Sequence, residues 1–383
     1  MRIAVVSNYS WLISRKNYGT LFQAFALQRA LKERGHDVFL VKDGSVAFAR
    51  GSFLVALRYR CGRILRALGL IGDCGAAKRV AYERKHPRNF EEFIDRNIEL
   101  SSKFYDRFSI KSRFPLADAY ISGSDQVWGA VDDLKFLNFA PEKKILRIAY
   151  AASGPWSALG SDWFDYARGV LKNFTAISVR EREGLECCAR AGIPGAKLVC
   201  DPTLLLGAGD YRSLIRKYNC DVTYPKPFIL VYLVNVSGFK SPDFSKIKNA
   251  LGSDYDIKVV AVQGCECAEL PEEYLEYPTP AQWLNLFDKA DYVLTNSFHG
   301  TMFSQIFKKN FTVLKQSGKT AAENCRFVSA LSKLGLLDRI LSTDDADEIL
   351  SVMRRQIDWN SVDRALGEFV RESNAFLDEA LKV

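Results

Sequence analysis

The stretch DYVLTNSFHGTMF, residues 291–303, decides the fold class that this sequence predicts. It opens with a short apolar run, Tyr292 to Leu294, which is typical of a buried β-strand. A polar loop follows, and a helical pattern begins at Thr301. A strand, a loop and a helix in this order indicate an open α/β sheet, in which ligands bind beyond the carboxyl ends of the strands.

His299 lies on the predicted loop and is one of only three histidines in the chain. The free N–H groups at a helix N-terminus favour an anion, and a histidine there can serve as a general acid or as an anion ligand. The alternative is that His299 caps the helix or bonds a backbone carbonyl. The small hydroxyl and amide side chains beside it favour the first interpretation, and Asn296 and Ser297 are therefore candidate ligand contacts.

The composition is that of a soluble globular protein. The chain has 383 residues, enough for two domains of ordinary size, and it is 48% hydrophobic and 26% charged. No apolar run reaches the roughly 18–20 residues that span a bilayer, and the N-terminus reads directly as a strand. Nine cysteines are scattered without a secreted-domain pattern or zinc-site spacing. We therefore expect a cytoplasmic protein with free thiols and no metal.

The positive charge is concentrated in one segment. The formal net charge is +8, and residues 51–114 alone hold 14 Lys and Arg against 7 Asp and Glu. Within this segment, residues 53–71 form a basic amphipathic helix. It is either a surface helix packed on the core or a helix that rests on an anionic membrane surface at the inner face. No nucleic-acid-binding module accompanies it, so nucleic acid is not an expected partner.

Short apolar runs alternate with helical patterns along the chain, which indicates parallel α/β sheets. The main predicted strands are 2–7, 37–41, 117–122, 146–153, 175–181, 228–236, 256–264, 291–296 and 311–315, and within 197–206 a short strand precedes Asp201 and Pro202. Residues 218–227 contain turn formers and two prolines, which predicts a linker. We expect a Rossmann-like domain over 1–217, with a basic helical insertion at about 51–114, and a second Rossmann-like domain over 228–383 that ends in helices. The two domains face a cleft.

Candidate ligand contacts also lie in the first half of the chain. Asn17 and Gly19 stand at the mouth of the first helix and either face a ligand or form an ordinary turn. Gly123 permits close backbone approach after a strand, and Ser124 and Asp125 begin a turn there. Taken alone, Asp125 is typical of a helix cap.

Arg180 ends the predicted strand 175–181. An arginine at the carboxyl end of a strand is well placed for bidentate contact with a carboxylate or a phosphate. The alternative is a salt bridge with a neighbouring acid.

Six motifs follow one another in a characteristic order. They are NYGT (17–20), SGSDQVW (122–128), SVRE (178–181), DPTLLL (201–206), PAQWLNLF (280–287) and TNSFHGTMFS (295–304). Together they resemble the polysaccharide pyruvyl transferase family, from about residue 1 to about residue 340. The resemblance implies a two-domain, glycosyltransferase-B-like α/β fold. It also implies transfer of pyruvate from phosphoenolpyruvate to a sugar, with formation of a ketal and release of phosphate.

The resemblance also implies roles for individual residues. Arg180 matches the family arginine that holds phosphoenolpyruvate, and His299 matches the histidine that binds this donor and acts as an acid. The turn of Gly123, Ser124 and Asp125 would line the cleft, and Asp125 would handle an acceptor hydroxyl. The chemistry requires no metal and no cofactor beyond phosphoenolpyruvate as co-substrate.

A second cation for the donor is not obvious in the motifs. Some relatives have an arginine where this chain has Ser297, so the cation must come from elsewhere. Lys315, at the end of the next predicted strand, is the candidate, with Arg326 behind it. The acceptor would be a sugar of a bacterial surface polysaccharide or its lipid-linked precursor. The alternatives are a glycosyltransferase of the same fold that uses a nucleotide sugar, and a non-catalytic sugar- or phosphate-binding relative.

Overall fold

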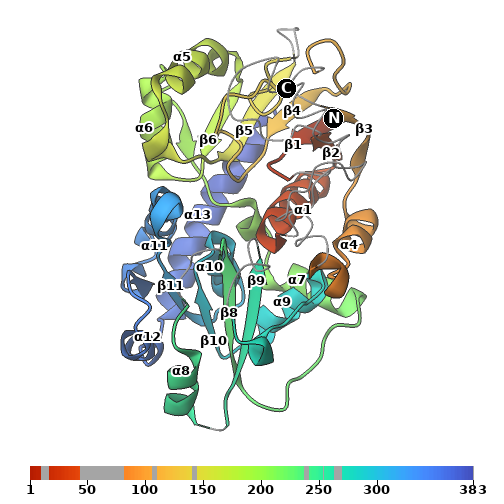
Figure 1. The fold of residues 1–383 in the computed structure, drawn as a ribbon. Helices are drawn as coiled ribbons and strands as arrows, with labels where there is room; N and C mark the ends of the chain where they lie inside the picture. Colours follow the sequence, from red (N-terminus) through yellow and green to blue (C-terminus); the bar gives the residue numbers. More distant parts are fainter. Residues whose placement is uncertain are drawn as a thin grey trace, which may run out of the picture.

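The computed structural model describes residues 1–9, 17–43, 82–105, 110–139, 145–236, 241–252, 254–262 and 270–382 (Figure 1). The predicted basic helix at 53–71 lies outside these residues, as does much of the predicted insertion. Among the described helices, none combines the length and apolar character that crossing a bilayer requires.

The first half of the chain forms a parallel sheet of seven strands in the order β3-β2-β1-β4-β5-β6-β7. The strands are β1 (Arg2–Val6), β2 (Asp37–Asp43), β3 (Leu100–Tyr105), β4 (Ala119–Ser122), β5 (Leu146–Ala152), β6 (Ala176–Val179) and β7 (Lys197–Leu198). The accompanying helices are α1 (Tyr18–Glu33), α4 (Phe90–Asn97), α5 (Ser161–Val170), α6 (Arg182–Arg190) and α7 (Ala208–Lys217). The strand order reverses between β1 and β4, and such a switch point is where open α/β sheets bind ligands.

The second half forms a parallel sheet of five strands in the order β12-β11-β10-β8-β9. The strands are β8 (Phe228–Val234), β9 (Asp256–Val262), β10 (Tyr292–Thr295), β11 (Asn310–Leu314) and β12 (Ile340–Leu341). The helices are α8 (Phe244–Leu251), α9 (Pro280–Lys289), α10 (Phe298–Ile306), α11 (Cys325–Ser332), α12 (Ala346–Met353) and α13 (Trp359–Ala380). Here the order reverses between β8 and β10, so the loop after β10 also lies at a switch point.

Two parallel α/β sheets confirm the predicted fold class. The linker predicted at 218–227 lies between the two sheets in the sequence, and we propose that the domain limits 1–217 and 228–383 follow them. In Figure 1 the first sheet lies above the second, and α13 runs alongside both. Ser373 of α13 accepts a hydrogen bond from the backbone N–H of Cys200, at 2.9 Å, just after β7.

An aromatic cluster joins the two sheets through α1. The ring of Tyr18 stacks on that of Trp283 with centroids 5.2 Å apart, and Phe22 stacks on Trp283 at 5.5 Å. The Tyr18 hydroxyl also donates to the carbonyl of Pro278 at 2.5 Å. All three rings are buried in a core that includes residues of both sheets. Each aromatic pair contributes about 0.5–1.5 kcal/mol beyond its buried area, so this cluster holds the N-terminus of α1 against the second sheet.

The structure corrects one predicted helix start and gives the length of one predicted strand. The sequence predicts a helix start at Thr301, but α10 begins at Phe298 because Ser297 is the N-cap, its hydroxyl accepting from the N–H of Gly300 at 3.3 Å. The short strand predicted before Asp201 covers Lys197–Leu198, and a turn over Pro202–Leu205 follows it. Pro202 begins a 3₁₀ turn there, since proline has no N–H for a ladder and fits the start of a helical turn.

Candidate active site

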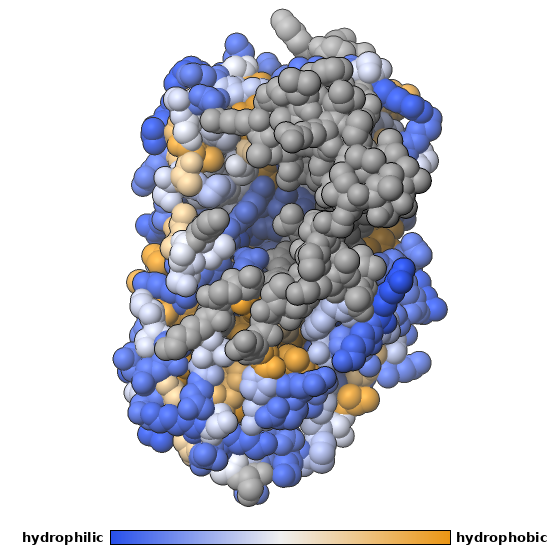
Figure 2. Space-filling model, in the orientation of Figure 1, coloured by the Kyte–Doolittle hydropathy of each residue, from blue (hydrophilic) through white to orange (hydrophobic). Residues whose placement is uncertain are grey.

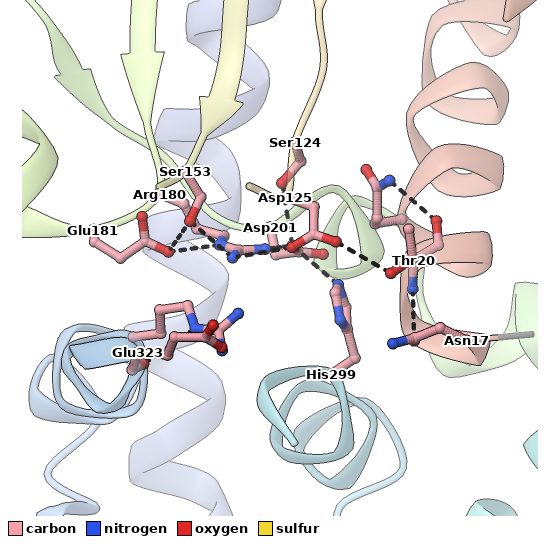
Figure 3. A network of polar contacts seen from close by, with 12 residues as sticks. Asn17, Thr20, Ser124, Asp125, Ser153, Arg180, Glu181, Asp201, His299 and Glu323 are labelled. Atoms are coloured by element: carbon pink, nitrogen blue, oxygen red, sulfur yellow. Dashed lines mark hydrogen bonds and ion pairs between the residues drawn. The ribbon is translucent and has the colours of Figure 1, made fainter. Parts of the chain in front are cut away.

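Four buried polar side chains meet where the two sheets face each other (Figure 3). Asp125 follows β4, Arg180 follows β6, and Asp201 follows β7 by three residues. His299 comes from the first turn of α10, in the second sheet's layer. Their exposed fractions are 7%, 5%, 1% and 5%, respectively. Figure 2 shows a hydrophilic recess between the upper and lower halves of the molecule.

Arg180 is the centre of the cluster. Its Nε donates to Glu181 Oε1 at 2.8 Å, its Nη1 to Asp201 Oδ2 at 2.8 Å, and its Nη2 to Ser153 Oγ at 3.0 Å. The carboxylate of Asp125 is farther away, with Oδ1 at 3.7 Å from Nη2. Of the alternatives for Arg180, the structure therefore shows salt bridges to neighbouring acids.

The guanidinium of Arg180 remains charged and keeps some donor capacity. Burial by itself lowers the pKa of Arg180, but the negative charges of Glu181, Asp201 and Asp125 outweigh it and raise the pKa above its ordinary value. A guanidinium has five N–H donors, and three of them make the hydrogen bonds above. Asp125 is the most loosely held partner, so the side of Arg180 toward Asp125 is where an incoming anion would meet N–H groups.

Asp201 is a site residue that the sequence analysis does not identify. Its Oδ1 accepts from the backbone N–H and the hydroxyl of Thr203, at 3.0 and 2.8 Å, and its Oδ2 accepts from Ser124 Oγ at 3.3 Å. Burial would raise the pKa of Asp201, but the positive charges of His299 and Arg180 hold it well below its usual range. The available signal was its position in the DPTLLL motif, directly after a strand.

His299 points toward Asp201. Its Nε2 lies 3.6 Å from Asp201 Oδ2, and within the described part of the chain this buried nitrogen has no hydrogen-bond partner. The helix-capping alternative for His299 does not apply, because Ser297 is the N-cap. The other edge of the ring lies against Gly19, where an added methyl group would overlap the Cβ, Cγ and Nδ1 of His299. Gly19 thus allows α1 to touch the catalytic candidate on α10.

Asp125 is held in an uncommon conformation. Its φ is +69°, in the left-handed region, and its carbonyl accepts from the N–H groups of Val127 and Ser153 at 2.6 and 3.0 Å. Its Oδ2 accepts from the Thr20 hydroxyl at 3.2 Å. Burial would raise the pKa of Asp125, but the charges of Arg180 and His299 leave it below its ordinary value. Asp125 is not the N-cap of any described helix, so the helix-cap interpretation is wrong and its carboxylate faces the cluster.

The loop before His299 is fixed by its own polar side chains. The amide of Asn296 accepts from the Val234 N–H at 2.7 Å and donates to the Val234 carbonyl at 2.9 Å. Asn296 thus ties the end of β10 to the end of β8, and Ser297 begins the helix. Both side chains orient the loop through bonds within the second sheet's layer.

The sequence pattern of the polysaccharide pyruvyl transferase family matches residues 17–318. This protein belongs to the polysaccharide pyruvyl transferase family. The matched range contains all four members of the buried cluster, and it also contains Gly19.

Several solved structures are similar to this pyruvyl transferase family member at low sequence identity. One is a Listeria monocytogenes protein described as a UDP-N-acetylglucosamine 2-epimerase, with 10% identity, coverage of 100% of this chain and 96% of that chain, and a TM-score of 0.50. Another is the UDP-GlcNAc 2-epimerase of Neisseria meningitidis, with 10% identity, coverage of 100% and 99%, and a TM-score of 0.49. The glycotransferase of kitacinnamycin has 17% identity, coverage of 99% and 97%, and a TM-score of 0.42. No curated protein sequence matches the chain.

The two parallel α/β sheets of this family member form a glycosyltransferase-B-like fold.

The two candidates for a second cation, Arg326 and Lys315, differ in burial. Burial raises the pKa of Asp125, and the positive charges of Arg180 and His299 lower it. The positive charge of Arg326 lowers it further. Arg326 itself is buried and ion-paired with Glu323. Lys315 follows β11 and its side chain is exposed.

Three residues that the sequence predicted to line the cleft form hydrogen bonds around the cluster. Gly123 continues the sheet, with its N–H donating to the Val6 carbonyl at 2.7 Å, and Ser124 bonds Asp201. Asn17 is the N-cap of α1, its side chain accepting from the Thr20 N–H at 3.2 Å. Thr20, which holds Asp125, is the other site residue that the sequence analysis does not identify. Among the described residues, no three or more His, Cys, Asp or Glu side chains are arranged so that they could hold a metal ion.

Proposed function

We propose that this protein transfers the pyruvyl group of phosphoenolpyruvate to two hydroxyls of a sugar, forming a ketal and releasing phosphate. The proposal is supported by family membership. The observation that carries it is the buried Nε2 of His299, which faces Asp201 and is without a hydrogen-bond partner in the described chain. An imidazole held there by an ionised carboxylate is suited to proton transfer.

The reaction can be written so that every proton is accounted for. A proton added to the methylene carbon of phosphoenolpyruvate makes the adjacent carbon electrophilic. A first sugar hydroxyl attacks this carbon and loses its proton to a base. Phosphate then leaves, and a second hydroxyl attacks the same carbon. One hydroxyl proton replaces the proton spent on the methylene carbon, and the other departs with phosphate.

The residues of the cluster suit these steps. His299 would protonate the methylene carbon through Nε2. Arg180 would bind an anionic group of the donor with the N–H groups on its Asp125 side, where the present contact is 3.7 Å. Asp125 is ionised at neutral pH and would accept the hydrogen of an attacking hydroxyl. Asp201 would orient the imidazole and stabilise its charged form.

A second cation is needed for a donor with both a phosphate and a carboxylate. We propose Arg326, because its charge reaches Asp125 and its side chain is buried. Lys315 would serve less well from its exposed position. Asn296 and Ser297 would then support donor binding by fixing the loop before His299.

The acceptor we propose is a sugar of a bacterial surface polysaccharide or of its lipid-linked precursor, met in the cytoplasm or at the inner membrane face. Residues 51–114 carry a local excess of positive charge, 14 Lys and Arg against 7 Asp and Glu, which supports contact with an anionic carrier.

The test is phosphate release from phosphoenolpyruvate with a panel of sugar acceptors, together with a thermal-shift titration by phosphoenolpyruvate alone. We expect stabilisation by the donor and phosphate release with a matching acceptor. His299→Gln keeps a polar side chain of similar length but cannot supply the proton, and it should lose turnover while remaining folded. Indifference to phosphoenolpyruvate, with hydrolysis or transfer of a nucleotide sugar, would replace this proposal by a glycosyltransferase.

A further inference from the structure

The hydrogen bonds of Arg180 all come from the first sheet's side of the cluster (Figure 3). Glu181, Asp201 and Ser153 accept its N–H groups at 2.8, 2.8 and 3.0 Å. The N–H groups of a guanidinium lie in one plane, so these partners hold the side chain by its edges. A hydrogen bond weakens steeply only below an angle of about 120°, so edge contacts alone let the plane tilt. Restraint of the tilt therefore has to come from a group on a face of the guanidinium.

The ring of Phe298 lies over one face of this guanidinium. The Cζ of Arg180 is 4.0 Å from the centroid of the ring, and the exposed fractions of the two side chains are only 5% and 4%. A desolvated cation over an aromatic face is held more strongly than an exposed one. The contact uses none of the five N–H groups, so it restrains the plane and leaves the donors toward Asp125 available.

Phe298 belongs to the other layer of the molecule. It is the first residue of α10, directly before His299, whereas Arg180 follows β6 of the first sheet. A second contact between the layers lies close by in the sequence, where the N–H of Arg182 donates to Ser329 Oγ at 3.1 Å. The edges of Arg180 are thus held by its own layer, and one face is held by the opposite layer.

A buried phenylalanine is also ordinary core packing, and Phe298 does belong to the main apolar core. Another arginine provides a comparison within the chain. The Cζ of Arg190 lies 4.0 Å from the ring centroid of Phe164, but Arg190 is exposed and takes no part in the cluster. The two pairs share their distance and differ in whether the arginine belongs to the candidate active site, so they separate packing from a role in the site.

We propose that Phe298 is a positioning residue for the donor. Its ring sets the plane of Arg180, so that the N–H groups on the Asp125 side point at an anionic group of phosphoenolpyruvate. Arg180 is oriented for the donor only while α10 lies against it, so the protein with its two layers apart would bind the donor weakly. This inference rests on the proposed function, because it takes phosphoenolpyruvate as the ligand of Arg180.

Replacement of the ring tests the proposal by separating donor binding from turnover. Phe298→Leu keeps an apolar side chain without a ring face, and it should raise KM for phosphoenolpyruvate about tenfold, the loss expected for one charge-assisted hydrogen bond. Titration calorimetry should show the same rise in the Kd of the donor. At saturating donor, kcat should stay within about threefold, because the proposed acid itself is unchanged.

Two further variants identify the ring face as the cause. Phe298→Tyr keeps the face, and a cavity of about 20 Å³ that borders the ring offers room for the hydroxyl, so KM should stay within about twofold. Phe164→Leu is the matched control, because it removes a ring at the same distance from an arginine outside the site, and it should leave KM and Kd unchanged. Urea unfolding of each preparation measures the loss of packing. If Phe298→Leu does not fold, Phe298→Met, whose flexible chain fills irregular gaps, decides in the same assays.

The outcomes separate this inference from the proposed function. An unchanged KM in Phe298→Leu, or a fall in kcat alone, overturns the positioning role and leaves the proposed function standing. The same follows if Phe298→Tyr raises KM as much as Phe298→Leu, or if Phe164→Leu raises it equally. Failure of the unchanged protein to bind phosphoenolpyruvate overturns the proposed function, and this inference with it.

Discussion

Gly19 of α1 lies against His299 of α10, and this contact leads to a sharp prediction. A methyl group at Gly19 would overlap the Cβ, Cγ and Nδ1 of His299. The ring is buried and packs against Phe298 as well, so it cannot accept the methyl group without moving. Gly19→Ala should therefore displace the imidazole from Asp201.

The size of the effect can be worked out for both activity and stability. Overpacking a buried site costs about 1–3 kcal/mol, and replacing glycine by alanine in a helix returns up to about 1 kcal/mol. The free energy of unfolding should therefore fall by no more than about 3 kcal/mol. A displacement of about 1 Å at a reacting group costs about 100-fold in rate, so kcat/KM should fall by about that factor.

The assay is phosphate release at several donor concentrations, with urea unfolding of the same preparations. Gly367→Ala is the matched control, because Gly367 lies in the middle of α13 and its added methyl would meet only Arg371 Nη1, at 3.8 Å. The control should keep full activity and gain up to about 1 kcal/mol of stability. If Gly19→Ala retained kcat/KM within threefold of the unchanged protein, the placement of His299 as a positioned acid would be refuted.

Three further predictions concern the groups around the site. Asp201→Asn should lower the free energy of unfolding at pH 7 by about 3 kcal/mol, measured in urea, because it removes one carboxylate from the buried ion pairs of Arg180 and disturbs the bonds to Thr203. Since the pKa of Asp201 is depressed in the folded protein, this stabilisation is present above about pH 4 and disappears as the pH falls toward the folded-state pKa, so the two proteins should converge in acid. Asn296→Ala removes two hydrogen bonds to Val234 and should cost about 2 kcal/mol in the same assay; an unchanged urea midpoint would contradict its anchoring role. Arg326→Met should raise KM for phosphoenolpyruvate at least tenfold and Lys315→Met less than twofold, and the opposite ranking in steady-state kinetics would make Lys315 the second cation.

The sequence by itself determined the fold class and most of the strands. Buried parallel strands appear as short apolar runs, and the periodicity of 2–7 or 228–236 is a local property that needs no partner to be recognised. It also placed His299, Arg180 and Asp125 at the carboxyl ends of strands or just beyond them, because parallel sheets present those ends at one edge. Two edge strands were missed, because β3 (LSSKFY) has no continuous apolar run and β12 has only two residues.

Only the tertiary structure decided what these residues touch. Thr20 reaches Asp125 across 105 positions of sequence, and His299 faces Asp201 across 98, so no local pattern could join them. The same holds for Arg180, for which the sequence allowed either a ligand contact or a salt bridge. Glu181 is its neighbour in the chain, but Asp125 and Asp201 come from separate turns that only the packed sheet brings within hydrogen-bond or ion-pair distance. Hydrogen bonds and ion pairs act over a few ångströms, and that proximity is created by the fold rather than by sequence spacing.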